Sequence, residues 1–180
     1  MPDRTRPIGL VSLVLFLASV PAANWLIGNV GTCIPNGPCV VPVAPGLMAP
    51  SGVLAAGAAL VLRDVVQRCL GLWWSIAAVL LGTGLSILVA PPALVMASGA
   101  AFMLSEMADL AVYTPLQRRG LVLAVVASAC LGLVVDSVVF LGLAFHSLDF
   151  LAGQVIGKLW AVLVSIPLIR LLRRVAPTPA

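Results

Sequence analysis

Six apolar runs, each about as long as a lipid bilayer is thick, make up most of this 180-residue chain. A helix needs roughly 20 apolar residues to cross the hydrocarbon layer, whereas the strands of a membrane barrel alternate apolar and polar residues. These runs do not alternate, so we expect helices at 8–27, 49–67, 72–90, 93–114, 121–145 and 150–172. The sequence therefore predicts an all-α polytopic membrane protein, with six transmembrane helices in a single domain over residues 1–180.

The arginines near the ends of these runs give the chain an orientation. They flank the start of the first run and the ends of the second, fourth and sixth, at Arg4, Arg6, Arg68, Arg118, Arg119, Arg170, Arg173 and Arg174. The other three connections contain no Lys or Arg, which is the positive-inside pattern with both termini cytoplasmic. The formal net charge of +4 is spread over four flanks, so it argues against a nucleic-acid partner. We expect a multi-pass protein of the cell membrane.

The first run also resembles a signal peptide. Arg4 and Arg6 precede an apolar stretch, and Val20-Pro21-Ala22-Ala23 would serve as a cleavage region. Cleavage would leave five spans and an external N-terminus. The six-span interpretation keeps every basic flank on one side of the membrane, so we favour it.

Four cysteines are present, and two of them lie in the long connection at 28–48. Cys33 and Cys39 would face the compartment that permits disulfides, so they form either a small disulfide ring or two unpaired thiols. Cys69 and Cys130 are expected to be reduced. His146, the only histidine, lies in an expected turn with no metal-ligand spacing around it. We expect no metal site and no cofactor.

Ionisable residues inside the apolar runs predict a polar site. Each costs roughly 2.5–3.5 kcal/mol in hydrocarbon on insertion scales, so it needs a partner, water or a ligand. They are Asp64, Glu106, Asp109, Asp136 and Lys158. Because Asp64 and Asp136 occupy corresponding spans of the two halves, the chain is also compatible with a 3+3 inverted repeat that has its site between the halves.

The fourth run places Glu106, Asp109 and Tyr113 on one helical face, at spacings of three and four residues. Two acids one turn apart can exchange a proton during transport or accept hydrogen bonds from a ligand. The alternative is a purely structural role, in which both acids pair with Arg63 or Lys158. We favour the functional role, because intramembrane acids usually mark a site.

Two further sets of residues are singled out by the charges they carry inside or at the end of an apolar run. Arg63, Asp64, Gln67 and Arg68 close the second run, and apart from the deeper Arg63 they have the pattern of an interface anchor. Asp136 and Lys158 have no compensating charge on their own helices, so we expect them to face one another or to share a ligand.

Five segments together resemble the queuosine-precursor transporter family, also called the vitamin-uptake-transporter-like family. They are Ala23-Asn24-Trp25 and the runs 46–68, 97–119, 131–145 and 153–160, with the elements R-D, S-E-x-x-D, Y-T-P, V-D-S and G-K-x-W. The resemblance implies a six-helix carrier that imports 7-cyano-7-deazaguanine, 7-aminomethyl-7-deazaguanine or a related purine-like base, coupled to a proton or another ion.

A deazaguanine presents a ring N–H and an exocyclic amine that one carboxylate can accept, a carbonyl that needs a donor, and a flat face that stacks on aromatic rings. We therefore expect a small-molecule base to contact a set of residues on five of the six spans. They are Asn24, Arg63, Glu106, Asp109, Tyr113, Asp136, Gln154, Lys158 and Trp160.

Two other classes of function stay open. The chain has no phosphate-binding loop for ATP, so it could serve as the substrate-binding component of an ATP-driven uptake complex with a separate ATPase. A membrane redox enzyme that uses Cys69 and Cys130 is disfavoured, because these cysteines lack a C-x-x-C spacing. We expect a transport protein and no enzyme, embedded in the lipid bilayer, with the homodimeric state left open.

Overall fold

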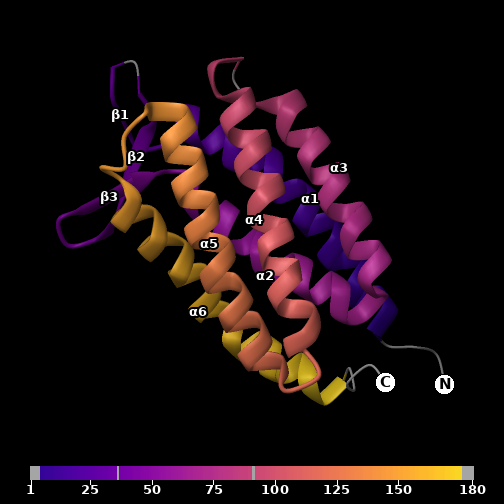
Figure 1. The fold of residues 1–180 in the computed structure, drawn as a ribbon. Coiled ribbons are helices and arrows are strands. Elements are labelled where there is room, and N and C mark those ends of the chain that lie inside the picture. The colour runs from indigo at the N-terminus through magenta and orange to yellow at the C-terminus, as the bar shows by residue number, and fades with distance from the viewer. Residues whose placement is uncertain (1–4, 36, 91, 176–180) are drawn as a thin grey trace.

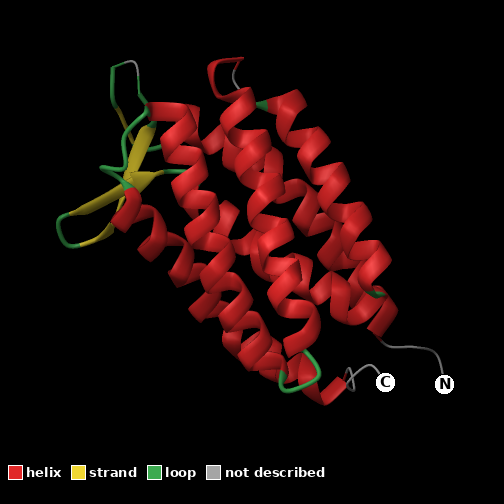
Figure 2. Ribbon diagram, viewed as in Figure 1, coloured by secondary structure: helices red, strands yellow, loops and turns green. Residues whose placement is uncertain are grey.

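A computed structural model describes residues 5–35, 37–90 and 92–175 of the chain. Within this part six long helices form a bundle and three short strands form a sheet at one end (Figures 1 and 2). The helices are α1 (Thr5–Asn29), α2 (Val53–Leu70), α3 (Leu72–Val89), α4 (Val95–Leu116), α5 (Leu121–Phe145) and α6 (Leu151–Val175), with a short 3-10 turn, η1 (Pro92–Leu94). The predicted helical runs are therefore present, with boundaries shifted by a few residues.

Successive helices run in opposite directions, so α1 begins and α6 ends at the same end of the bundle (Figure 1). Four helices, α1, α3, α4 and α5, are long and apolar enough to cross a membrane. The helix α2 is not among them, because it contains the charged residues Arg63, Asp64 and Arg68. In α6 the described apolar part, Leu151–Pro167, is shorter than a membrane span. The six-span topology thus stays a prediction for these two helices.

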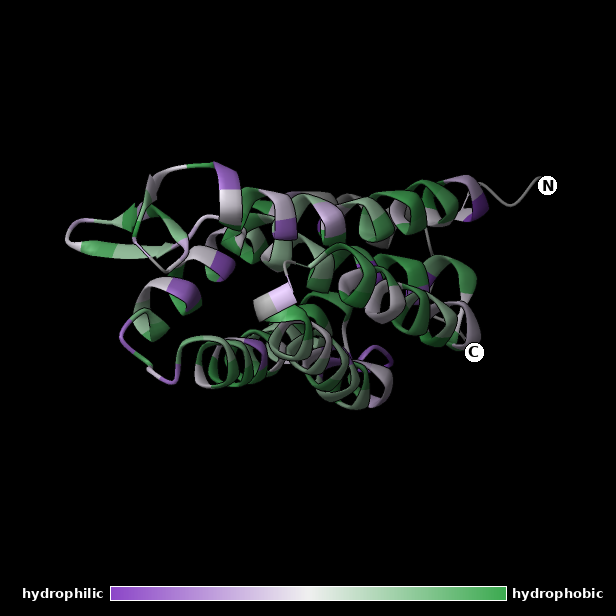
Figure 3. Ribbon diagram, turned by 90° about the horizontal axis from the view of Figure 1, so that it is seen from above, coloured by the Kyte–Doolittle hydropathy of each residue, from purple (hydrophilic) through white to green (hydrophobic). Residues whose placement is uncertain are grey.

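The outer faces of the helices are apolar. Trp73 and Met96 are each 80% exposed and Leu88 is 81% exposed. Soluble proteins rarely expose large apolar side chains over a continuous surface. Seen from above, the helices are mostly coloured as hydrophobic, with hydrophilic residues in a few places (Figure 3). Such a surface fits contact with lipid chains, and it agrees with the predicted membrane protein.

Two apolar clusters hold the bundle together. The first joins α2, α4, α5 and α6 through Val61, Tyr113, Leu121, Ala124, Val125, Ala129, Val162 and Ile169. The second joins α1, α2 and α3 through Phe16, Ala59 and Ala78, with Phe102 of α4 packed against it. Between these clusters the helices carry the polar residues described below.

The sheet replaces a predicted outer loop. It comprises β1 (Thr32–Cys33), β2 (Cys39–Ala44) and β3 (Leu47–Pro50), paired antiparallel in that order. The two-residue connection Pro45-Gly46 joins β2 to β3, and Gly46 has the positive φ of 73° that such a turn requires. A disulfide joins Cys33 to Cys39, which confirms the first of the two expectations for these cysteines.

The second predicted span begins too early. Residues 49–52 belong to β3 and the following turn, and α2 begins only at Val53. The Ser51 hydroxyl donates to the Leu26 carbonyl oxygen at 2.5 Å, and the Ser51 amide donates to the Cys39 carbonyl oxygen at 2.9 Å. These contacts to α1 and β2 hold the segment extended, where apolar composition alone predicted helix.

The packing gives the inverted repeat partial support. The pairs α1–α2 and α4–α5 pack most extensively, as corresponding pairs of a 3+3 repeat would. In contrast, α2 packs along α6, while the corresponding pair α5 and α3 scarcely touch. The two halves therefore pack differently on one another, and the repeat stays a prediction.

Candidate functional site

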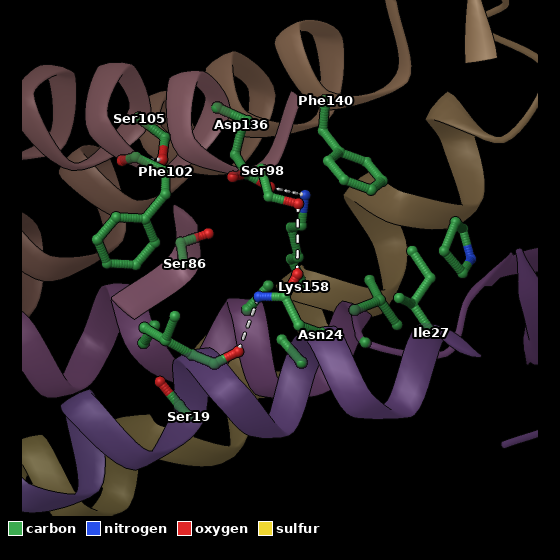
Figure 4. A pocket seen from close by; sticks show the side chains of 18 of the residues that line it. Ser19, Asn24, Ile27, Ser86, Ser98, Phe102, Ser105, Asp136, Phe140 and Lys158 are labelled. Carbon is green, nitrogen blue, oxygen red and sulfur yellow. Dashed lines mark hydrogen bonds and ion pairs between the residues drawn. The ribbon is translucent and has the colours of Figure 1, made fainter. Parts of the chain in front are cut away.

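A partly open cavity lies in the half of the bundle nearer the sheet. It has about 700 Å³ of empty space, a volume that includes open solvent at its mouth. Figure 4 shows Phe102 of α4 and Phe140 of α5 flanking the hollow, with Asp136 and Lys158 at its side. Its polar lining comes from Ser19, Asn24, Ser86, Ser98, Ser105, Glu106, Asp136, Gln154 and Lys158.

An ion pair between α5 and α6 forms part of the wall. Lys158 Nζ lies 2.5 Å from Asp136 Oδ2, and it also donates to Ser137 Oγ at 2.8 Å and to Gln154 Oε1 at 2.6 Å. Three acceptors match the three N–H donors of an ammonium group. The predicted pairing of Asp136 with Lys158 is confirmed, and Ser137 and Gln154 complete it.

The backbones of α2 and α6 approach one another closely at this pair. A Cβ on Gly57 of α2 would lie 2.8 Å from Lys158 Cα and 2.9 Å from the Lys158 carbonyl oxygen. A Cβ on Gly157 would likewise lie within 3 Å of the Val53 side chain. These small residues therefore let α6, which carries Lys158, lie directly against α2.

Deeper in the bundle, Arg63 of α2 binds three carboxylates. Its Nη1 lies 2.9 Å from Asp64 Oδ1, its Nε lies 3.1 Å from Glu106 Oε2 and its Nη2 lies 2.6 Å from Asp109 Oδ1. The four side chains are 0% or 1% exposed. We call Arg63, Asp64, Glu106 and Asp109 the Arg63 cluster. Of the two partners left open for Glu106 and Asp109, the structure selects Arg63.

Neighbouring polar groups orient the cluster. Arg63 Nη1 donates to Gln67 Oε1 at 3.3 Å, and Gln67 Nε2 donates to Thr114 Oγ1 at 3.0 Å. Ser128 of α5 donates to Asp64 Oδ2 at 3.2 Å. The predicted interface anchor is therefore wrong for Asp64 and Gln67, because helices α4 and α5 cover them and supply their partners.

The nine predicted site residues fall into three groups. Five of them line the cavity: Asn24, Glu106, Asp136, Gln154 and Lys158. Arg63, Asp109 and Tyr113 are buried behind it, with the Tyr113 ring centroid 5.7 Å from Arg63 Cζ. Trp160 is 50% exposed, and its Nε1 donates to the Val43 carbonyl oxygen of β2 at 3.0 Å, so it anchors the sheet to α6.

Sequence reasoning missed the hydroxyl groups of the cavity. Ser98 of α4 donates to Asn24 Oδ1 of α1 at 3.3 Å, while Asn24 Nδ2 donates to the Val20 carbonyl oxygen at 3.1 Å. Ser86 of α3 also lines the wall. A serine in an apolar helix usually bonds its own backbone, so the sequence held no signal that separated these two from the others.

An apolar helical bundle around a polar cavity has the architecture of a membrane transport protein. A family model described as "Putative vitamin uptake transporter" matches residues 85–179, which is more than half of the chain, and the chain belongs to this family. The match begins in the last residues of α3, extends through α6 and includes Glu106, Asp109, Asp136 and Lys158. Comparisons with curated proteins and with solved structures gave no match.

Proposed function

We propose that the protein imports a 7-deazaguanine base, 7-cyano-7-deazaguanine or 7-aminomethyl-7-deazaguanine, through this cavity. The observation that carries the proposal is the set of atoms on the cavity wall. Two aromatic rings flank a hollow whose lining combines carboxylates, amides and hydroxyls from five helices, α1, α3, α4, α5 and α6. The family membership supports uptake as the activity, and the sequence resemblance supports the class of base.

The available hydrogen-bonding atoms fit the edges of such a base. Among the described residues, Glu106 Oε1 and Asp136 Oδ1 have no protein hydrogen-bond partner, although the second oxygen of each carboxylate is bound. A carboxylate at either place can accept the ring N–H and the exocyclic amine. Gln154 uses its oxygen on Lys158, which leaves its amide N–H groups for the carbonyl of the base.

The stacking surface also follows from the structure. Trp160 lies on the outside of the bundle, so it is not part of this proposal. Phe102 and Phe140 replace it as the flat faces beside the hollow (Figure 4). Stacking on such rings does not distinguish the hydrogen-bonding groups along the edge of the base. We therefore assign discrimination between bases to Glu106, Asp136 and Gln154.

In the membrane, we propose that all six helices span and that both termini face the cytoplasm. Burial of Arg63, Asp64 and Lys158 inside the protein supports this for α2 and α6, since their charges do not face lipid. The cavity then lies in the outer half of the membrane, nearer the sheet.

The direct test is uptake of labelled 7-cyano-7-deazaguanine by cells that lack both its synthesis and any carrier of their own. Expression of the protein should give saturable uptake, and guanine should compete. Hypoxanthine lacks the exocyclic amine and should compete at least about tenfold more weakly, because a carboxylate then stays unpaired. The exposed Asp149→Asn variant serves as a control that leaves uptake intact. Uptake no greater than in cells with an empty vector would contradict the proposal.

A second experiment separates the carrier from a component of an ATP-driven complex. The purified chain alone, in liposomes without ATP, should exchange labelled for unlabelled base. Exchange that needs an added ATPase would favour the ATP-driven complex.

A further inference from the structure

We propose that the Arg63 cluster is a proton-binding site, and that one proton crosses the membrane with each molecule of ligand. This inference rests on the proposed transport function. It names the coupling ion, the residues that hold it and the number carried.

The first argument is the charge balance of the interior. The described ionisable groups that face it are Arg63, Asp64 and Arg68 of α2, Glu106, Asp109 and Tyr113 of α4, Asp136 of α5 and Lys158 of α6. Three cations thus stand against four carboxylates, even when the half-buried Arg68 is counted. One excess negative charge inside a membrane protein costs several kcal/mol, and one bound proton removes it.

The second argument is that a polar atom at the cluster lacks a partner. Among the described residues, the Tyr113 hydroxyl has no hydrogen-bond partner, although Tyr113 is 0% exposed. A buried polar atom without a partner costs about 1–3 kcal/mol. The water molecule that delivers or accepts the proton would give this hydroxyl a hydrogen-bond partner.

The third argument is that the cluster lies between two openings. Glu106 lines the main cavity. Asp64 and Tyr113 line a second, much smaller cavity together with Arg68 and Ile169, which lie toward the end of the bundle where α1 begins and α6 ends. Because Arg63 contacts both Glu106 and Asp64, it joins the two cavities through a single side chain.

The transfer step involves only O–H bonds. A hydronium ion in the main cavity gives its proton to the Glu106 carboxylate, which becomes neutral, and a water molecule remains. The proton passes to Asp109 and Asp64, which Arg63 holds beside Glu106, and water in the second cavity accepts it from Asp64. The base is neutral, so the proton that crosses with it makes each transport event carry one positive charge across the membrane.

The stoichiometry is tested with the purified chain in liposomes that enclose a pH-sensitive dye, with labelled 7-cyano-7-deazaguanine as the neutral probe. An inward gradient of the probe, at equal pH on both sides, should acidify the interior by one proton per molecule taken up. Uptake of the probe without acidification would overturn the inference and leave the proposed transport function standing.

The cluster itself is tested by Asp109→Asn, because Asp109 does not line the main cavity. This change leaves three cations against three carboxylates, so no proton is needed. Accumulation driven by a pH gradient should fall by more than about tenfold, whereas exchange of labelled for unlabelled probe should fall by less than about threefold. Asp149→Asn, on the exposed turn after α5, should change neither. Unimpaired accumulation by Asp109→Asn would contradict the inference.

A measurement without ligand keeps the inference testable if the probe is not transported. At neutral pH the infrared spectrum of the purified protein should contain a protonated-carboxyl band that shifts in D₂O. The band should persist in Asp149→Asn and disappear in Asp109→Asn. Its absence from the unmodified protein would exclude a bound proton, whatever the ligand proves to be.

Discussion

Lys158 of α6 and Asp136 of α5 neutralise one another inside the bundle, with Nζ 2.5 Å from Oδ2. Removal of Asp136 leaves the buried Lys158 ammonium uncompensated, which costs about 3–5 kcal/mol, and removal of Lys158 leaves the partly exposed Asp136 carboxylate uncompensated at a smaller cost. We therefore expect Asp136→Asn and Lys158→Met each to lower the thermal unfolding temperature and the yield of the purified protein.

The double variant Asp136→Asn/Lys158→Met should be more stable than the sum of the two single losses, even where transport stays abolished. A double-mutant cycle on unfolding temperatures measures this coupling. Additive losses would show that the two charges do not stabilise one another.

Arg63 cannot be replaced by lysine without loss, because one ammonium nitrogen cannot contact three carboxylates in the directions that a guanidinium serves. We expect Arg63→Lys to lower the unfolding temperature and to reduce uptake by more than about tenfold. Arg118→Lys, in the exposed turn after α4, is the matched control and should behave as the unmodified protein. Equal behaviour of the two variants would mean that the cluster tolerates any cation.

The close approach at Gly57 predicts a steric effect. In Gly57→Ala the new methyl group would meet the Lys158 backbone, so α2 and α6 must separate at a cost of about 1–3 kcal/mol. Gly142→Ala is the matched control on α5, because no atom lies within 4 Å of its new Cβ. Thermal unfolding should show a loss for Gly57→Ala and no loss for Gly142→Ala, and the reverse order would contradict the packing of α2 on α6.

The four cysteines predict a thiol count. Cys33 and Cys39 form a disulfide, whereas Cys69 and Cys130 do not. Alkylation of the unfolded, unreduced protein should therefore label two sites, and alkylation after reduction should label four. Mass spectrometry distinguishes these outcomes, and four labels without reduction would exclude the disulfide.

The proposed topology predicts which positions react with a membrane-impermeant thiol reagent. Cysteines introduced at Pro45 and Ser147, in a background with Cys69 and Cys130 replaced by serine, should react in intact cells. A cysteine at Arg118 should react only after the membrane is permeabilised, because the basic flanks are expected inside. Reaction at Arg118 from outside would reverse the orientation.

The sequence predicted the partner of a charged residue best where the residue's own helix offered no opposite charge. Asp136 and Lys158 lack opposite charges on their own helices, so a pairing between the two helices was the simplest solution, and the structure has this ion pair. Asp64 failed this test, because Arg68 at i+4 offered a local partner. Its actual partners include Arg63 and the Ser128 hydroxyl of α5, and no pattern in one helix predicts what a distant helix contributes.

The sheet was also missed, although a signal was present. Pro45-Gly46 separates two short apolar segments, and Pro followed by Gly favours a tight turn. The apolar character of 49–52 drew this segment into the predicted second span instead. Hydropathy cannot distinguish a strand that packs on α6 from the first turn of a membrane helix.

The contact between Gly57 and Lys158 has a consequence for motion. It joins the helices that carry Arg63 and Lys158, while the extensively packed α4 and α5 carry Glu106, Asp109 and Asp136. Apart from Asp64, which lies beside Arg63 on α2, the buried acids therefore lie on the opposite side of the α2–α6 and α4–α5 interface from the buried cations. Any rocking of α2–α6 away from α4–α5 must separate them in a medium of low dielectric constant, where attraction is strongest. These ion pairs therefore hold α2–α6 against α4–α5, and a ligand or proton that neutralises the acids would weaken that attraction.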